Sequence, residues 1–401
     1  MTSILLPFCS LFSKKIKLFV AGRTNTFNEI AAFQSKGKTV WFHVASLGEF
    51  EQARPLIERC KKEYPNDTIA LTFFSPSGYE IQKNYQHADL ICYLPLDTKK
   101  NAQQFIALLN PAIAIFIKYE FWPHYLNELH KTNTKTLLVA GIFRKNQLFF
   151  QFYGGFMRKS LQAFHHFFVQ DTHSEALLKK INISNTTVAG DTRFDRVAEI
   201  LNQNNLLDFI TNFKDNHYTV VAGSTWKEGE AFLKTYINNE ATNDEKFIIA
   251  PHQINTAAIK ELQTSIVKKS VLYSEKEGKN LAEYQVFIID TVGLLTKIYA
   301  EADVAYVGGG LKTGLHNILE PATFGIPVVI GSRYKKHKEA VDLTTLKGCL
   351  SIKNQKEFSF VLKQLKEDFS FRKKTGIINK KYVESHLGAT QTVFDYLRKS
   401  I

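Results

Sequence analysis

Short apolar runs alternate with longer amphipathic stretches along most of the chain. In the first half, runs of β-branched and aromatic residues predict strands at residues 39–44, 68–72, 112–116, 136–139 and 167–169. Between these strands, stretches such as 51–62 and 98–109 carry apolar residues at helical spacing. Strands that alternate with helices of this length predict parallel βαβ units.

The second half of the chain repeats this pattern. Buried parallel strands are predicted at residues 218–222, 246–250, 286–289, 304–307 and 327–330. A polar stretch at 202–217 separates the halves, and 401 residues suit about two domains. We therefore predict an α/β protein with two doubly wound Rossmann-like domains, 1–205 and 206–401, facing a cleft. Ligands of such sheets bind beyond the carboxyl ends of the strands, so the motifs that follow strands matter most.

Composition points to an anionic partner. Lys and Arg exceed Asp and Glu by 51 − 38 = 13, which favours nucleic acid, an anionic membrane or a phosphorylated substrate. The basic run at 335–338 is too short for a nucleic-acid-binding arm and is typical of a solvated face. Four scattered cysteines form neither a zinc motif nor a disulfide framework, and they indicate a reducing cytoplasmic setting.

The N-terminus carries an apolar segment, residues 4–12, followed by Lys14, Lys15 and Lys17. It is shorter than the roughly 20 residues of a spanning helix. A secretory signal would place its positive charge before the apolar stretch. Two interpretations remain: a monotopic anchor on an anionic leaflet, or a first helix packed on the protein itself.

Two motifs of the first half suggest an acceptor site. After the strand at 39–44, Ser46 and Gly48 form a turn, and Glu49 lies in the first turn of a helix. Gly48 permits a tight turn or close backbone approach. Glu49 can act as general base towards a sugar hydroxyl or merely complement the helix dipole. The aromatic segment 117–123 contains Glu120 and forms either packing beneath the cleft or an acceptor wall.

A glycine-rich motif at 304–321 suggests a donor site. The strand ends in Gly308, Gly309 and Gly310, and a helix is predicted to begin near His316. Glycine turns before a helix present backbone N–H groups to phosphate, although a plain strand–helix turn explains them too. Glu320 lies one helical turn after His316, so the two would share a face, and its carboxylate suits ribose hydroxyls.

Two further strand ends lie in the same half. Ser224 and Thr225 follow the strand at 218–222 and serve either as a helix N-cap or as donor contacts. His252 follows the strand at 246–250 and is either structural or a donor contact. We find no Asp-x-Asp motif for a metal, and we expect no cofactor.

Together these motifs resemble the transferases of 3-deoxy-D-manno-octulosonic acid (Kdo), which move Kdo from CMP-Kdo to a lipid A precursor. The resemblance covers most of the chain, and it is the number and order of the motifs that make it specific. They lie at residues 43–49, 72–80, 93–97, 120–123, 190–195, 223–225, 308–321 and 324–328. Two departures are the absence of an arginine between Pro251 and His252, and Lys118 where the family commonly has an acidic residue.

The resemblance implies a GT-B fold with the acceptor in the N-terminal domain and the CMP-sugar in the C-terminal one. It also implies inversion at the anomeric carbon without a metal, at the cytoplasmic face of the bacterial inner membrane, where the protein is peripheral or anchored by its N-terminus. Glu49 would be the general base, and Ser46, Gly48 and Glu120 would bind the acceptor. The donor would contact Ser224, Thr225, His252, Gly308, Gly309, Gly310, His316, Asn317 and Glu320.

Two alternatives belong to other functional classes. One is a GT-B transferase or epimerase that uses a UDP-sugar. The other is a non-enzymatic protein that binds a nucleotide-sugar or nucleic acid, which would require aromatic residues interleaved with arginines. The lysines here are dispersed, and we expect an anionic membrane surface rather than nucleic acid as the partner.

Overall fold

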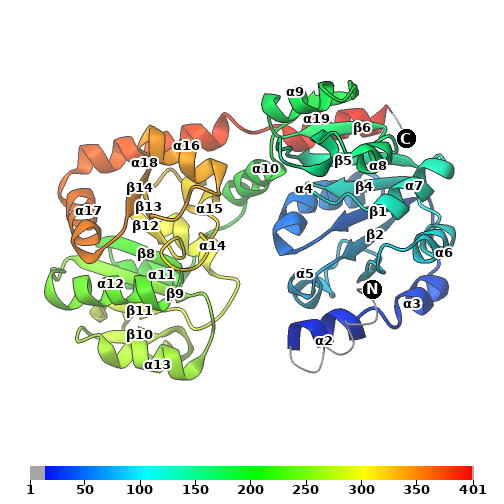
Figure 1. The fold of residues 1–401 in the computed structure, drawn as a ribbon. Helices are drawn as coiled ribbons and strands as arrows, with labels where there is room; N and C mark the ends of the chain where they lie inside the picture. Colours follow the sequence, from blue (N-terminus) through cyan, green and yellow to red (C-terminus); the bar gives the residue numbers. More distant parts are fainter. Residues whose placement is uncertain (1–13, 400–401) are drawn as a thin grey trace. The chain divides into compact units, whose positions relative to one another are not determined.

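The computed structural model describes residues 14–399, which form two compact α/β units (Figure 1). The chain leaves unit 1 after Arg196, forms unit 2 as Val197–His386, and returns to unit 1 at Leu387. The predicted division between 205 and 206 therefore falls inside unit 2, and the last helix belongs to the first unit. The apolar segment at 4–12 lies outside the described residues.

Unit 1 is built on a seven-stranded parallel sheet with the order β3-β2-β1-β4-β5-β6-β7. The order reverses between β1 and β4, which is where doubly wound sheets bind ligands. The strands are β1 (Thr39–Val44), β2 (Thr68–Phe73), β3 (Leu90–Tyr93), β4 (Ile113–Ile117), β5 (Lys135–Gly141), β6 (His166–Val169) and β7 (Thr186–Val188).

Unit 2 has a second seven-stranded parallel sheet, with the order β10-β11-β9-β8-β12-β13-β14. Here the order reverses between β8 and β12. The strands are β8 (Tyr218–Thr225), β9 (Glu245–Pro251), β10 (Ser270–Leu272), β11 (Val286–Ile288), β12 (Val304–Val307), β13 (Val328–Gly331) and β14 (Cys349–Ile352). All ten predicted strands are confirmed, with ends that differ by up to three residues.

Helices flank both sheets (Figure 1). Those of unit 1 are α2 (Lys14–Ala21), α3 (Thr26–Ala32), α4 (Leu47–Glu63), α5 (Pro76–Gln82), α6 (Lys99–Leu109), α7 (Pro123–Lys131), α8 (Gly155–Leu161), α9 (Thr172–Lys179) and α19 (Ala389–Arg398), with α10 (Thr192–Ala198) at the crossing. Those of unit 2 are α11 (Asp208–Lys214), α12 (Lys227–Asn239), α13 (Thr256–Ser265), α14 (Leu295–Ile298), α15 (Leu319–Thr323), α16 (Lys338–Leu346), α17 (Gln355–Glu367) and α18 (Phe369–Glu384). Short 3₁₀ turns are η1 (Leu148–Phe150), η2 (Glu199–Asn202), η3 (Tyr273–Glu275), η4 (Leu281–Glu283) and η5 (Tyr299–Glu301).

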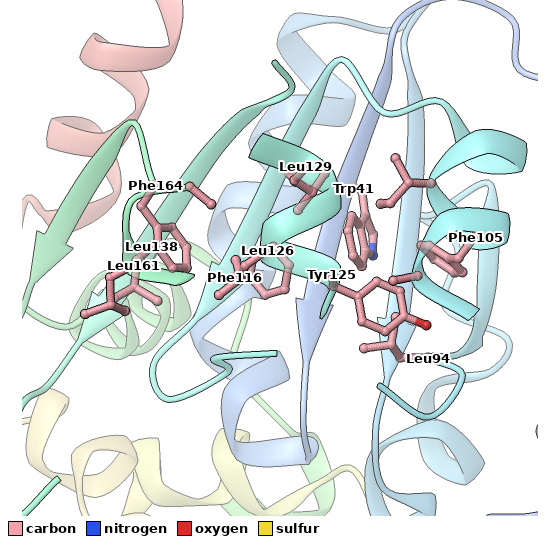
Figure 2. Packing of buried hydrophobic residues seen from close by; sticks show 14 of the residues in the cluster. Trp41, Leu94, Phe105, Phe116, Tyr125, Leu126, Leu129, Leu138, Leu161 and Phe164 are labelled. Carbon is pink, nitrogen blue, oxygen red and sulfur yellow. The ribbon is translucent and has the colours of Figure 1, made fainter. Parts of the chain in front are cut away.

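The core of unit 1 shows why these segments fold as they do. Alternate residues of a strand point to opposite faces, and Trp41 of β1 and Phe116 of β4 point to the face covered by α6 and α7 (Figure 2). Their rings lie 5.1 Å apart and meet edge to face. Phe105 of α6 and Tyr125 of α7 pack on the same cluster. Both faces of the sheet are thus buried, which explains the nearly continuous apolar strands.

The last helix closes the other face of the same sheet. Val393, Phe394 and Leu397 of α19 are buried with strand residues of unit 1. The carboxylate of Asp195 accepts hydrogen bonds from the backbone N–H groups of Gly388 (2.7 Å) and Thr390 (2.6 Å). It therefore caps the N-terminus of α19, where the helix dipole favours a negative charge.

Two further observations bear on the sequence analysis. Within residues 14–399, no helix is both long and apolar enough to cross a membrane. The three cysteines in this range, Cys60, Cys92 and Cys349, are buried free thiols, and burial raises the pKa of Cys60 to about 12. They behave as small apolar core residues.

Candidate active site

In unit 1, Glu49 lies where the strand order reverses, just beyond β1. The chain turns at Ser46, whose extended backbone (φ −147°) precedes α4, and Glu49 occupies the first turn of that helix, as predicted. Ser46 does not cap α4 with its side chain; its hydroxyl instead donates a hydrogen bond to a carboxylate oxygen of Glu49. This bond orients a half-buried carboxylate at the carboxyl edge of the sheet.

Gly48 lies in α4 and not in a tight turn, so the tight-turn interpretation is wrong. It is exposed, and the nearest atom to a Cβ placed there would be Ser46 Oγ at 3.8 Å. The fold itself does not require glycine for space. Beside Glu49, the missing side chain leaves room for a ligand to approach the backbone.

Charged groups of both signs gather around Tyr119. Tyr119, which follows β4, accepts a hydrogen bond from Arg144 Nη2 at 3.3 Å. Burial raises the pKa of the Tyr119 hydroxyl; the charges of Glu49 and Asp191 act in the same direction, whereas Arg144 and Arg193 oppose it. The Tyr119 hydroxyl therefore lies within reach of the charges of the other four side chains.

Asp191 fixes the position of Arg193 in this neighbourhood. Its carboxylate accepts from Arg193 Nη2 at 2.8 Å and from Gln52 Nε2 at 3.0 Å. Burial alone would raise the pKa of Asp191, but the charge and hydrogen bonds of Arg193 and the hydrogen bond of Gln52 outweigh it and hold the pKa below its usual range. Asp191 is therefore a buried carboxylate that stays ionised and anchors an arginine near Glu49.

Glu120 is 8% exposed and belongs to a buried polar network. Its Oε2 accepts from Trp122 Nε1 (2.9 Å) and lies 3.3 Å from Nε2 of the fully buried His43. Nδ1 of His43 contacts the Thr72 hydroxyl at 2.8 Å. Of the two interpretations of the aromatic segment, the contacts of Glu120 match packing beneath the carboxyl edge, and its acceptor role stays a prediction.

In unit 2, a β-bulge shapes the strand end that faces β12. The β8–β9 register shifts at Ser224, which has a left-handed backbone (φ 51°). The bulge carries the Ser224 carbonyl so close to Gly308 that a Cβ there would lie 1.9 Å from its oxygen. Neither Ser224 nor Thr225 caps α12, because Trp226 is the N-cap and the Thr225 hydroxyl donates to Glu230 at 2.8 Å. The N-cap interpretation is therefore wrong.

The segment after β12 is a closed loop and not the predicted helix. Gly309 and Gly310 adopt φ values of 78° and 71°, and the N–H of His316 donates back to the Gly308 carbonyl at 3.2 Å. The helix α15 begins only at Leu319. A helix from His316 would place Pro321 in its interior, where the ring clashes with the preceding turn, whereas in α15 Pro321 sits in the tolerated first turn.

Three rings from three strand ends meet in unit 2. The ring centroids of Trp226, His252 and His316 lie 4.2–6.3 Å from one another. Trp226 Nε1 donates to His316 Nε2 at 2.9 Å. Because indole N–H only donates, Nε2 must accept, and the proton of the neutral imidazole lies on Nδ1. Burial lowers the pKa of His316 to about 4, with contributions from His252 and His337. Burial also lowers the pKa of His252.

Glu320 is held beside this cluster by two hydrogen bonds. Its carboxylate accepts from Asn317 Nδ2 (3.0 Å) and Thr296 Oγ1 (2.8 Å). A carboxylate has about four acceptor positions, so further donors such as ribose hydroxyls can still bind. Because His316 is not helical, the predicted shared helix face is wrong, and Asn317 provides the link to Glu320.

A cavity of about 630 Å³ opens at the carboxyl ends of β8 and β9. Thr225, Trp226 and Pro251 line it, together with three glutamates from α12 and α13. Burial raises the pKa of one of these, Glu230. The volume lies in the range of small-ligand pockets.

The sequence analysis missed several residues of these clusters, namely Tyr119, Arg144, Arg193 and Trp226. Each lies within five residues of a strand end, which is the signal that the sequence carries for them. Among the described residues, no three His, Cys, Asp or Glu side chains are grouped so that they could hold a metal ion. Metal independence stays a prediction.

Comparison with known proteins finds a family model that matches most of unit 1. Residues 21–196 match the family described as 3-deoxy-D-manno-octulosonic-acid transferase (kdotransferase). The 3-deoxy-D-manno-octulosonic acid transferase of Chlamydophila psittaci is 25% identical over 326 residues, covering 78% of this chain and 74% of that protein. The protein of the same name from Rickettsia bellii is 26% identical over 336 residues, covering 81% and 79%.

Among solved structures, the UDP-GlcNAc 2-epimerase of Neisseria meningitidis bound to UDP-GlcNAc resembles this chain with a TM-score of 0.62. It is 13% identical, and the match covers 90% of this chain and all of that one. At this identity the likeness concerns the fold alone, and the predicted GT-B class is confirmed. The family match over residues 21–196 and the related sequences together show that the chain is similar to the 3-deoxy-D-manno-octulosonic acid transferases.

Proposed function

We propose that this protein transfers Kdo from CMP-Kdo to a lipid A precursor, with inversion and without a metal, at the cytoplasmic face of the bacterial inner membrane. The observation that carries the proposal is the Ser46–Glu49 pair beyond β1 in a chain that is similar to this family. A carboxylate held by a neighbouring hydroxyl is suited to take a proton from an acceptor hydroxyl.

Unit 1 would bind the acceptor. Its candidate base is accompanied by Arg144 and Arg193, which favour a phosphorylated acceptor. Arg193 is already oriented by Asp191, so less side-chain freedom is lost on binding. The open space at Gly48 admits the acceptor close to the helix backbone.

Unit 2 would bind CMP-Kdo. The loop that begins at Gly308 offers backbone groups, and the His316 ring offers a neutral Nδ1–H donor to the leaving phosphate. Preorganised donors of this kind stabilise the charge that develops as CMP departs. Glu320 keeps acceptor positions for ribose hydroxyls. The arginine absent beside His252 leaves this loop as the main phosphate contact.

The test is to incubate the full chain with CMP-Kdo and a tetra-acylated lipid A precursor and to measure CMP release and product mass. The Glu49→Gln variant should fold normally and lose at least about 10²-fold in kcat. Glu51→Gln is the matched control, since it removes another half-buried carboxylate, paired with Arg196, from the same helix and should keep wild-type turnover. Full activity of Glu49→Gln would remove Glu49 as the base.

A UDP-sugar transferase or epimerase is the alternative, and nucleotide protection separates the two. CMP should raise the melting temperature of the protein, whereas UDP should leave it unchanged, because binding to the native state alone stabilises it. Protection by UDP with no effect of CMP would contradict the proposed donor.

A further inference from the structure

A loop in unit 1 and the first turn of the helix that follows it expose four large apolar side chains within nine residues. Leu148, Phe152, Tyr153 and Phe156 are 53%, 92%, 63% and 63% exposed, and we call them the aromatic patch. The loop joins β5 to α8. Such a run is unusual on a soluble surface, because a contiguous exposed apolar patch commonly marks an interaction site.

The loop holds the aromatic patch in a fixed conformation. Arg158 donates hydrogen bonds to the carbonyls of Phe149 (3.1 Å), Gln151 (2.6 Å) and Phe152 (3.4 Å). A Cβ at Gly154 would lie 1.7 Å from the Leu148 carbonyl oxygen, so only glycine allows this closure. Phe149 turns inward and is buried in the core against Phe121. The outward side chains are therefore presented by a folded scaffold.

Charge along the segment that carries the aromatic patch is of one sign. Residues 129–170 contain no Asp or Glu, and six Lys or Arg. Two of these are exposed on either side of the aromatic patch in the sequence, Lys145 in the loop and Lys159 in α8. Aromatic rings flanked by lysines match the interface of an anionic bilayer, where rings enter the headgroup region and cations meet the lipid phosphates.

The aromatic patch also adjoins the candidate acceptor site. The loop leaves the carboxyl end of β5, which pairs with β4, and its Arg144 donates to Tyr119 beside Glu49. A lipid whose headgroup is bound at Glu49 and whose acyl chains stay in a bilayer needs such a surface at the same edge of the sheet.

A second copy of the chain fits the aromatic patch less well than a bilayer does. Large apolar side chains bury about 150–250 Å² each, so four partly exposed ones supply roughly 500–600 Å². A stable interface needs about 800 Å² from each partner. The like charge of the surrounding lysines and arginines would also repel a copy of the same surface.

We propose that the aromatic patch, with Lys145 and Lys159, docks unit 1 on the surface of an anionic phospholipid bilayer. The inference rests on the proposed function for its link to a lipid acceptor, and it names where that membrane meets the chain. It is independent of the apolar segment at 4–12.

The test measures co-sedimentation of the full chain with vesicles that contain neither acceptor nor CMP-Kdo. Wild-type protein should bind phosphatidylcholine vesicles with 30% phosphatidylglycerol at least about tenfold more strongly than pure phosphatidylcholine vesicles. The double variant F152S/F156S should lower the partition coefficient at least about tenfold, because it removes two rings from the interface. K145E/K159E should lower it similarly at low salt and less at high salt.

Unit 2 offers matched controls. Phe360 and Phe369 are 66% and 63% exposed but lie beside Glu367 and Asp368, and Lys373 and Lys374 are exposed on α18. The variants F360S/F369S and K373E/K374E should bind vesicles like wild type. Brominated lipids should quench the fluorescence of a Phe152→Trp variant more than that of wild type, which has three native tryptophans. The fluorescence of a Phe360→Trp variant should show no such extra quenching.

Wild-type binding by F152S/F156S would overturn the proposal, because the membrane contact would then lie elsewhere, for instance in the N-terminal segment. A dimer that F152S/F156S dissociates without a change in vesicle binding would also overturn it and assign the patch to a second copy. Turnover on a detergent-dispersed acceptor should be unchanged in F152S/F156S. Loss of vesicle binding with normal turnover therefore reports on the patch alone, and absent turnover in wild type reports on the proposed function alone.

Discussion

Each unit places a tryptophan N–H against a histidine at the carboxyl edge of its sheet, but the two pairs have different surroundings. In unit 1, Trp122 Nε1 lies 3.0 Å from His43 Nε2; in unit 2, Trp226 Nε1 lies 2.9 Å from His316 Nε2. His43 is fully buried, and both of its ring nitrogens contact other protein groups. Among the described residues, Nδ1 of His316 has no hydrogen-bond partner, and the ring is partly exposed.

The difference indicates what each pair contributes. A histidine whose polar atoms are all satisfied inside the protein stabilises the fold, because its removal leaves buried partners unsatisfied. A histidine with one nitrogen fixed and the other open presents a donor of defined tautomer to a ligand. The same Trp–His contact is therefore structural in unit 1 and suited to binding in unit 2.

The largest expected effect is on stability. His43→Ala should lower the free energy of unfolding of unit 1 by about 3–5 kcal/mol, since it opens a cavity in the core and takes one hydrogen-bond partner each from the Glu120 carboxylate and the Thr72 hydroxyl. His316→Ala should change stability by less than about 1 kcal/mol. Guanidinium unfolding followed by far-ultraviolet circular dichroism reports both units, and fluorescence in a Trp226→Phe background assigns the loss in His43→Ala to unit 1, because the other two tryptophans lie there. Equal losses in both variants would remove the distinction.

The next effect is on turnover. Under the proposed function, His316→Gln should lower kcat/KM for CMP-Kdo by about 10²-fold, as expected when one preorganised donor to a developing charge is lost. The melting temperature should stay near the wild-type value. Steady-state kinetics at several CMP-Kdo concentrations would check this, and normal kinetics would show that His316 does not contact the donor.

A smaller effect should follow from Trp226→Phe. The ring contacts stay, but the N–H that fixes His316 is lost, so both tautomers become populated and kcat/KM should fall about five- to tenfold. Nitrogen-15 spectra of the His316 imidazole should change from one tautomer to a mixture. Trp122→Phe is the control and should leave that spectrum unchanged. Lost turnover with an unchanged spectrum would contradict a positioning role for Trp226.

The smallest effect is the pH dependence of stability that comes from His316. Burial lowers its pKa from 6.5 to about 4 in the folded protein. Between these values the unfolded chain binds a proton that the folded chain does not, so stability falls as the pH drops from about 6.5 to about 4 and changes no further below that. His316→Gln should lose less stability than wild type over this range. Parallel melting-temperature curves for the two proteins would contradict the lowered pKa.

The sequence predicts the interior of each sheet but not its edges. All ten predicted strands are inner strands, and the four that were missed, β3, β7, β10 and β14, are the edges of the two sheets. Inner strands are apolar on both faces, which makes them visible as continuous runs. Edge strands are short, and β7 has no buried position, so local periodicity carries little signal for them.

Site prediction has a similar limit. Glu49 and the glycine loop follow inner strands and were found from the sequence. The helix expected at His316 was wrong because the backbone hydrogen bond from His316 to Gly308 closes a loop, and only the three-dimensional structure reveals that contact. Arg144 and Trp226 were missed because they matter through Tyr119 and His316, which are distant in sequence.

The cap that Asp195 forms on α19 has a consequence for synthesis of the protein. Unit 1 needs residues at both ends of the chain, whereas unit 2 is continuous from Val197 to His386. During translation, unit 2 can fold as soon as it leaves the ribosome. One face of the sheet of unit 1 stays uncovered until Phe394 and its neighbours in α19 have been synthesised. A truncated chain that ends at His386 should therefore carry a folded second unit and an incomplete first one.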